Sequence, residues 1–172
     1  MPEARPEAWM RGPLQDIHPL LAPVLFSFQQ VTEDLALHTA NLTVDQVWAR
    51  PHGLPSLGFH LSHIAGSIDR LTAYLEGRQL SPQQLTALER ESNPGPDRDH
   101  LLEGISSSMA QAASVVRGLD IATLQDWRGV GRKQLPSTVI GLLVHIAEHT
   151  QRHAGQAVSA ANLARAFSGR FP

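Results

Sequence analysis

The feature that most constrains the fold of this sequence is an apolar repeat between Pro55 and Gly77. Leucine and isoleucine recur there at alternating intervals of four and three residues, at Leu57, Leu61, Ile64, Ile68, Leu71 and Leu75. This spacing puts them on one face of a helix with about 3.6 residues per turn. We therefore predict a helix that starts after Pro55, stops at Gly77 and buries this face against other helices.

Three further long stretches have the same period. The first covers residues 16–42, where Pro19 and Pro23 limit the regular helix to the residues after them, because proline fits only the first turn of a helix. Another starts after Asp97, whose side chain can cap it, and runs to about Leu119. Both stretches predict helices with one apolar face.

The last long stretch starts after Ser137 or Thr138, either of which can cap it, and extends to about Arg165. The Ser-Pro pair at 81–82 predicts a short additional helix, ended by a cluster of turn residues. Residues 120–136 lack a regular period, and we interpret them as a crossover loop with at most a short turn of helix. No stretch alternates in the way that predicts a strand.

These elements predict an all-α fold, a four-helix bundle with long connections. The chain has 172 residues, which is the length of one domain. We place this domain at residues 14–165 and expect flexible ends at residues 1–13 and 166–172.

Composition excludes several classes of function. The net charge of −2 gives no basic surface for nucleic acid or an acidic membrane. Because the chain has no cysteine, it cannot form disulfides, thiolate zinc sites or iron–sulfur clusters, or use a cysteine nucleophile. Any metal must therefore be held by nitrogen or oxygen. The N-terminal residues lack the apolar core of a signal peptide, so we expect a cytoplasmic protein.

Apolar side chains on the flanks of the predicted helices suggest self-association. Leu37, Leu142 and Val158 fall beside the apolar faces rather than within them. Such side chains leave apolar surface to cover, so we expect a homodimer.

Histidines carry the main chemical signal. His145, His149 and His153 follow one another at intervals of four on the last helix, so successive rings lie one turn apart on nearly the same face. Relative to the apolar face, His149 and His153 point into the bundle and His145 points sideways. A site in a bundle takes further ligands from facing helices, and the second predicted helix offers His60 and His63. The helical wheel alone favours His60, which lies nearer the centre of that apolar face.

Three neutral histidines with one open position suit zinc, nickel or a related divalent metal. Residues 145–149 also read H-x-x-E-H, the inverted metalloprotease motif. We reject that interpretation because residues 150–172 contain no acidic ligand and because Glu148 lies on the solvent side of the wheel. Di-iron bundles are also excluded, since no histidine has a glutamate three residues before it.

Two segments resemble the DinB-like superfamily of small four-helix metal-binding proteins. They are PSLGFHLSHIAGSIDRLTAYLEG and, about 65 residues later, TVIGLLVHIAEHTQRHAGQAV. The resemblance covers essentially residues 14–165 and implies a metal held by His63 of the second helix with His149 and His153 of the last. It selects His63 over His60, which we keep as an alternative, and it agrees with the choice of His149 and His153 over His145.

Members of that superfamily include metal-dependent transferases that use low-molecular-weight thiols such as bacillithiol. The resemblance therefore implies a thiol transferase with a small-molecule thiol and an acceptor as partners. The reacting group would be a thiolate or water bound to the metal, with zinc or nickel as the expected ion. We consider Arg70, Tyr74 and Arg152 candidate contacts for the thiol cofactor or for the acceptor. Two alternatives stay open: a non-catalytic, stress-related metal-binding module and a metal-dependent hydrolase.

Overall fold

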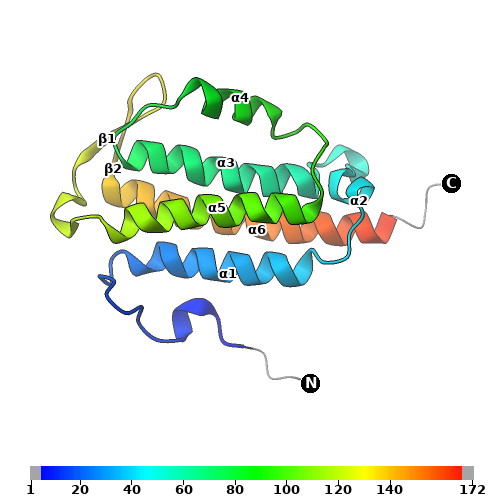
Figure 1. Cartoon of the computed structure of the whole chain (residues 1–172), viewed down its shortest axis with the longest axis horizontal. Coiled ribbons are helices and arrows are strands. Elements are labelled where there is room, and N and C mark those ends of the chain that lie inside the picture. The colour runs from blue at the N-terminus through cyan, green and yellow to red at the C-terminus, as the bar shows by residue number, and fades with distance from the viewer. Residues whose placement is uncertain (1–4, 168–172) are drawn as a thin grey trace.

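The computed structural model describes residues 5–167, and these form a helical bundle (Figure 1). The helices are α1 (Ala22–His38), α2 (Val44–Trp48), α3 (Leu57–Leu75), α4 (Pro82–Arg90), α5 (Arg98–Arg117) and α6 (Val139–Phe167). In the bundle, α3 packs against both α5 and α6, and α1 packs mainly against α6. The short helix α4 covers α3 from the side opposite α1 (Figure 1). The predicted all-α bundle of four long helices is confirmed.

The predicted apolar face of α3 forms the centre of the core. Leu57, Leu61, Ile64, Ile68 and Leu75 are almost completely buried. They meet apolar side chains of α1, α5 and α6, which include Val31, Leu35, Ile105, Val116, Leu142 and Ile146.

Side-chain caps stabilise the starts of α3, α5 and α6, and those at Asp97 and Thr138 are predicted from the sequence. Ser56 accepts a hydrogen bond from the backbone of Phe59 at the start of α3, and Asp97 accepts one from His100 in α5. Thr138 accepts one from the backbone of Gly141, so of the two candidates for α6 it is Thr138 that has this contact. Each side chain satisfies a backbone N–H that the first helical turn leaves without a partner.

Residues 120–136 differ from the prediction of a crossover loop. They contain a 3-10 turn (Ile121–Thr123) and strand β1 (Trp127–Val130), which pairs antiparallel with β2 (Leu135–Thr138). The guanidinium of Arg128 donates to the backbone oxygen of Leu75 at 2.8 Å, which ties the hairpin to the end of α3. Four-residue strands are too short to show alternation in the sequence, and this hairpin depends on a contact far away along the chain.

The sequence prediction also missed α2, a helix of five residues. Its start is stabilised by a capping box, in which the side chains of Thr43 and Gln46 each accept a hydrogen bond from the backbone of the other. Its last residue, Trp48, lies flat against Gly58 of α3, where a Cβ atom would come within 2.6 Å of the indole ring. The indole N–H donates to the backbone oxygen of Pro96 at 2.8 Å. These contacts fix the segment that leads into α3.

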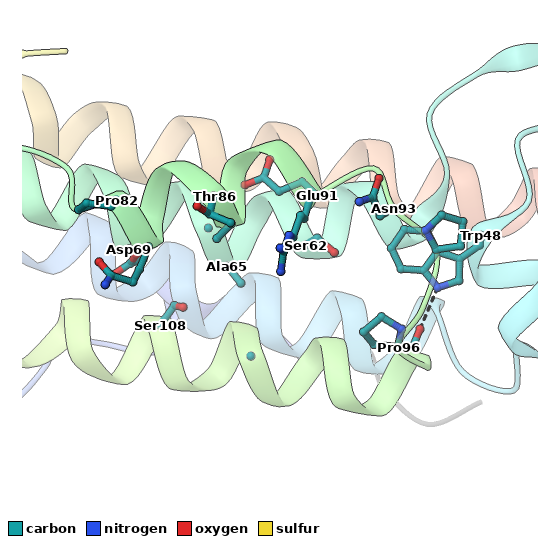
Figure 2. A pocket seen from close by; sticks show the side chains of 16 residues that line it. Trp48, Ser62, Ala65, Asp69, Pro82, Thr86, Glu91, Asn93, Pro96 and Ser108 are labelled. Atoms are coloured by element: carbon teal, nitrogen blue, oxygen red, sulfur yellow. Dashed lines mark hydrogen bonds between the residues drawn. The ribbon is translucent and has the colours of Figure 1, made fainter. Parts of the chain in front are cut away.

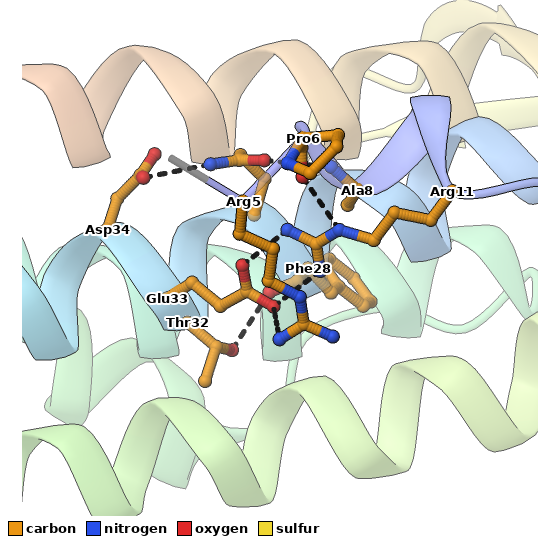
Figure 3. Close-up of polar contacts among 9 residues, drawn as sticks. Arg5, Pro6, Ala8, Arg11, Phe28, Thr32, Glu33 and Asp34 are labelled. Carbon is orange, nitrogen blue, oxygen red and sulfur yellow. Dashed lines mark hydrogen bonds and ion pairs between the residues drawn. The ribbon is translucent and has the colours of Figure 1, made fainter. Parts of the chain in front are cut away.

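The N-terminal segment lies along α1 (Figure 3). The guanidinium of Arg11 makes two hydrogen bonds of 2.6 Å to the Glu33 carboxylate, and the backbone N–H of Ala8 donates to the Gln30 side chain at 3.0 Å. Ala8 itself is buried. Residues 5–13, expected to be flexible, therefore contact the bundle, while residues 1–4 and 168–172 lie outside the described part of the chain.

The three apolar residues predicted on the flanks of helices differ in their exposure to solvent. Leu37 is 71% exposed and Val158 is partly buried, but Leu142 belongs to the core, so it leaves no surface to cover. The homodimer stays a prediction that now rests on Leu37 and Val158. None of the described helices combines the length and the apolar character that crossing a bilayer requires.

Candidate metal centre

Two neighbouring helices bring three histidines together. His63 comes from the middle of α3, and His149 and His153 lie one turn apart on α6. One ring nitrogen of each lies within 4.8 Å of those of the other two, and Nε2 of His63 is 3.0 Å from Nε2 of His149. Two nitrogens bound to one zinc ion at about 2.0–2.1 Å each lie about 3.3 Å apart, so the rings are already close to a shared-ion arrangement.

A hydrogen bond to the carboxylate of Glu91 fixes the orientation of His63. Its Nδ1–H donates to Oε2 of Glu91 at 2.7 Å, and Oε1 of Glu91 accepts from the guanidinium of Arg70 at 2.7 Å. A carboxylate only accepts, so the proton of neutral His63 sits on Nδ1 and the lone pair of Nε2 faces the other histidines. The ring of Phe59 stacks on His63 with a centroid distance of 5.5 Å.

The Glu91–Arg70 pair is buried and needs the glycine beside it. The Glu91 side chain is 6% exposed and the Arg70 side chain 9%. His63, Gly66 and Arg70 lie on one face of α3, and a Cβ atom on Gly66 would come within 2.6 Å of Nη1 of Arg70 and would also overlap Oε1 of Glu91. Glycine at this position therefore makes room for the pair that holds His63.

Two of the three histidines are held neutral. Burial, together with the smaller effect of the nearby His63, lowers the pKa of His149 and of His153 to about 4. At neutral pH their imidazoles are therefore unprotonated, which is the form that binds a metal.

The cluster fits a divalent ion in two respects. Its donors are three imidazoles, a set that zinc and nickel accept. In addition, Nδ1 of His149 is buried and has no hydrogen-bond partner among the described residues. If Nε2–H of His149 donates to Nε2 of His63, that Nδ1 carries a buried lone pair. Transferring the proton to Nδ1 would free both Nε2 atoms for one cation.

The alternative histidines lie at the edges of this cluster. His60 is buried, and its Nδ1 is 3.2 Å from Nδ1 of His153, so it contacts one member of the cluster from the side. His145 is about half exposed and pairs with Glu148 at 2.7 Å. His145, Glu148 and His149 also lie close enough to hold an ion, but Glu148 is exposed and is shared with Arg152, which binds it one turn further on.

The three candidate cofactor contacts occupy different positions. Arg70 is buried and engaged with Glu91, and Tyr74 is buried in the core one turn further along α3. Arg152 is the exposed one of the three and lies beside His153 on α6. Contact of any of them with a thiol stays a prediction. Of the three, only Arg152 is placed to reach a ligand from solvent.

A sequence model of the DinB superfamily matches residues 27–157. The chain belongs to the DinB superfamily. The match covers α1 to most of α6 and includes all three clustered histidines. No curated protein matches the chain. The superfamily assignment and the histidine cluster both support a DinB-like metal-binding protein.

Sequence reasoning about this DinB chain missed Glu91. The residue directly follows the short helix α4, and nothing in its local sequence distinguishes it from the exposed Glu89 two positions earlier. The available signal was indirect: Gly66 interrupts a good helix sequence between His63 and Arg70, which indicates that another group comes close to that face.

A groove of about 900 Å³ lies on the other side of Glu91. Figure 2 shows it between α3, α4 and α5, with Trp48 and Pro96 at one end and Asp69 and Pro82 at the other. None of the three clustered histidines lines it. Glu91 therefore lies between this groove and the cluster.

Proposed function

We propose that the protein is a metal-dependent transferase that joins a low-molecular-weight thiol of the bacillithiol type to an acceptor molecule. The observation that carries this proposal is the cluster of His63, His149 and His153, with His63 held by a buried carboxylate, in a DinB-superfamily chain that has no cysteine. Because the chain supplies no thiol of its own, a thiol nucleophile has to arrive with a cofactor.

His63, His149 and His153 would hold a divalent ion, with zinc or nickel as the ions that suit three imidazoles. A bound ion supplies the ionisation of a coordinated thiol at neutral pH. With three histidines as its ligands, the ion would keep one position open for a thiol.

The side chains around the cluster keep these ligands in place. Glu91 accepts the proton of His63 Nδ1 and so keeps Nε2 directed at the site, and Arg70 holds Glu91 from the other side. Phe59 covers one face of His63 and thereby restricts water on that side. Arg152 provides a positive charge at the solvent edge, where a carboxylate of a thiol cofactor would be attracted.

The test is thiol consumption by the full-length protein loaded with zinc or nickel. Bacillithiol, mycothiol and cysteine are each supplied with a panel of electrophiles, and the conjugate is followed by mass spectrometry. We expect metal-dependent conjugation that is lost in His63→Ala and retained in His100→Ala, which removes an exposed histidine of α5.

Each other result points to a different function. Equal turnover without any thiol would remove the transferase and favour metal-dependent hydrolysis. One bound ion per chain without turnover in any combination would favour the non-catalytic metal-binding module. Conjugation by metal-free protein would contradict the role given to the three histidines.

A further inference from the structure

A second cavity lies beside α6 and is lined by His60, which contacts His153 of the histidine cluster. It has a volume of about 400 Å³ and lies between α6 and the segment 51–55 that leads into α3. Small-molecule sites in proteins typically enclose about 300–1,000 Å³, so this cavity has the size for a small ligand.

One end of the cavity is polar and adjoins the cluster. His60 lines it, and Nδ1 of His60 is 3.2 Å from Nδ1 of His153. Arg152 and Gln156 complete the polar end from α6. A ligand in the cavity would therefore place its near end one imidazole ring away from a member of the cluster.

The remaining wall is mainly apolar. It consists of Pro51, Leu54, Pro55, Ala160 and Leu163, with Ser159 at its edge. Leu54 is 50% exposed and presents apolar surface to solvent at this wall. A ligand with an apolar body would cover this surface and remove it from water.

The charges of the residues that line the cavity indicate which charge a ligand can carry at its polar end. Among the described residues that line the cavity there is no aspartate or glutamate, and Arg152 is the one that carries a full charge. The polar contact described for this guanidinium is from Nη2 to Glu148, which leaves the donors of Nη1 and Nε for a ligand. An anionic or neutral polar group is therefore favoured at this end, and a cation is not.

We propose that this cavity binds the acceptor substrate, and that the acceptor is a largely apolar small molecule whose polar end is neutral or anionic and faces His60 and Arg152. The role of the ligand as acceptor rests on the proposed thiol transfer. The binding itself does not, because the cavity is formed by the chain alone.

The experiment measures binding of three eight-carbon probes to full-length protein, with and without zinc, by two-dimensional amide NMR. Octanoate, 1-octanol and octylammonium share an apolar body and differ in the charge of the polar end. We expect octanoate and octanol to shift the amides of Leu54, Gly155, Gln156 and Leu163 in both forms, and octylammonium to bind at least ten-fold more weakly. Shifts confined to the groove between α3, α4 and α5, or equal affinity for octylammonium, would overturn the proposal.

Two variants separate the apolar wall from the charged end. Ser159→Phe places a ring at the edge of the cavity, and we expect it to weaken all probes at least ten-fold. Ser107→Phe is the matched control, since Ser107 is an exposed serine within α5 that lines none of the cavities described and the two residue types have similar helix propensity. Arg152→Gln should reduce octanoate binding to the level of octanol and leave octanol unchanged. Unchanged binding in Ser159→Phe would contradict the assignment.

The proposed function and this inference can fail separately. If octanoate binds as expected but the metal-loaded protein consumes no thiol, the cavity stands and the transferase is wrong. If thiol is consumed and Ser159→Phe leaves kcat/KM for the acceptor unchanged, the transferase stands and the cavity is not the acceptor site.

Discussion

Gly66 leaves the space that the Glu91 carboxylate occupies, so a residue without a side chain in α3 determines how the acid behind His63 is placed. The glycine lies three residues after His63 and four before Arg70, on the same face of the helix. A glycine inside a helix costs about 0.5–1 kcal/mol relative to alanine. In this chain the glycine leaves room for a buried carboxylate with both oxygens engaged.

Replacing this glycine should weaken metal binding without the usual gain in stability. Gly66→Ala puts a Cβ atom where Glu91 and Arg70 meet, and one of them must move. Gly104→Ala is the matched control, since a Cβ there has open space and should stabilise the metal-free protein by about 0.8–1 kcal/mol. Urea unfolding and competitive zinc titration check both effects. A gain in stability with unchanged zinc affinity in Gly66→Ala would show that the pair relaxes freely.

Glu91→Gln should lower zinc affinity by roughly 10-fold or more, because outer partners of metal-binding histidines typically contribute about 10–100-fold. The glutamine can still accept from His63, but it removes the negative charge from between His63 and Arg70. Glu89→Gln, on the exposed side of α4, is the control and should leave the affinity unchanged. Chelator competition gives the affinities, and equal values for both variants would contradict the role assigned to Glu91.

The three clustered histidines should each be required for metal retention. We expect His63→Ala, His149→Ala and His153→Ala to reduce zinc affinity more than about 100-fold, beyond the effect of an outer partner. His145→Ala should retain most of it, because His145 is half exposed and its contact is with Glu148. Elemental analysis of purified variants should find about one ion per chain in the parent and in His145→Ala. Loss in all four variants would show that His145 is also needed to hold the ion.

The long helices could be predicted because each buries one face, and the apolar residues of that face recur at helical spacing within a short stretch of sequence. The same reasoning placed His149 and His153 toward the bundle. It also gave His60 the more buried position on α3, which the structure confirms. The nitrogen that lies near both histidines of α6, however, belongs to His63. Burial and proximity to another helix are different properties, and a helical wheel reports the first.

Other parts of the site depend on contacts that neighbouring residues do not encode. Glu91 reaches His63 because α4 lies across α3, and the hairpin is held where Arg128 meets the end of α3. Both contacts join residues that are 28 or more positions apart in the chain. The resemblance to a family supplied the choice of His63, which periodicity alone did not.

The metal-free protein should lose stability as the pH falls from about 6.5 toward 4. Above pH 6.5, His149 and His153 are neutral in both the folded and the unfolded chain, so they add no pH dependence. Below it, the unfolded chain takes up protons on both, while burial and the nearby His63 hold the folded pKa of each at about 4. Acid therefore favours the unfolded state throughout this interval.

A double variant isolates this contribution. His149→Gln/His153→Gln should reduce the dependence of unfolding free energy on pH between 6.5 and 5, and His100→Gln should leave it as in the parent. The part that remains is assigned to His60, because burial lowers its pKa as well. The interval stops at pH 5 because Glu33 also affects stability at lower pH. The hydrogen bond from Arg11 lowers the pKa of Glu33 below its ordinary value of 4.5, so the stability that this carboxylate contributes is lost once the pH falls below about 4.5. Urea midpoints of chelator-treated protein at each pH provide the measurement. An equally steep dependence in the double variant would show that other groups take up the protons and that the two histidines are not held neutral by burial.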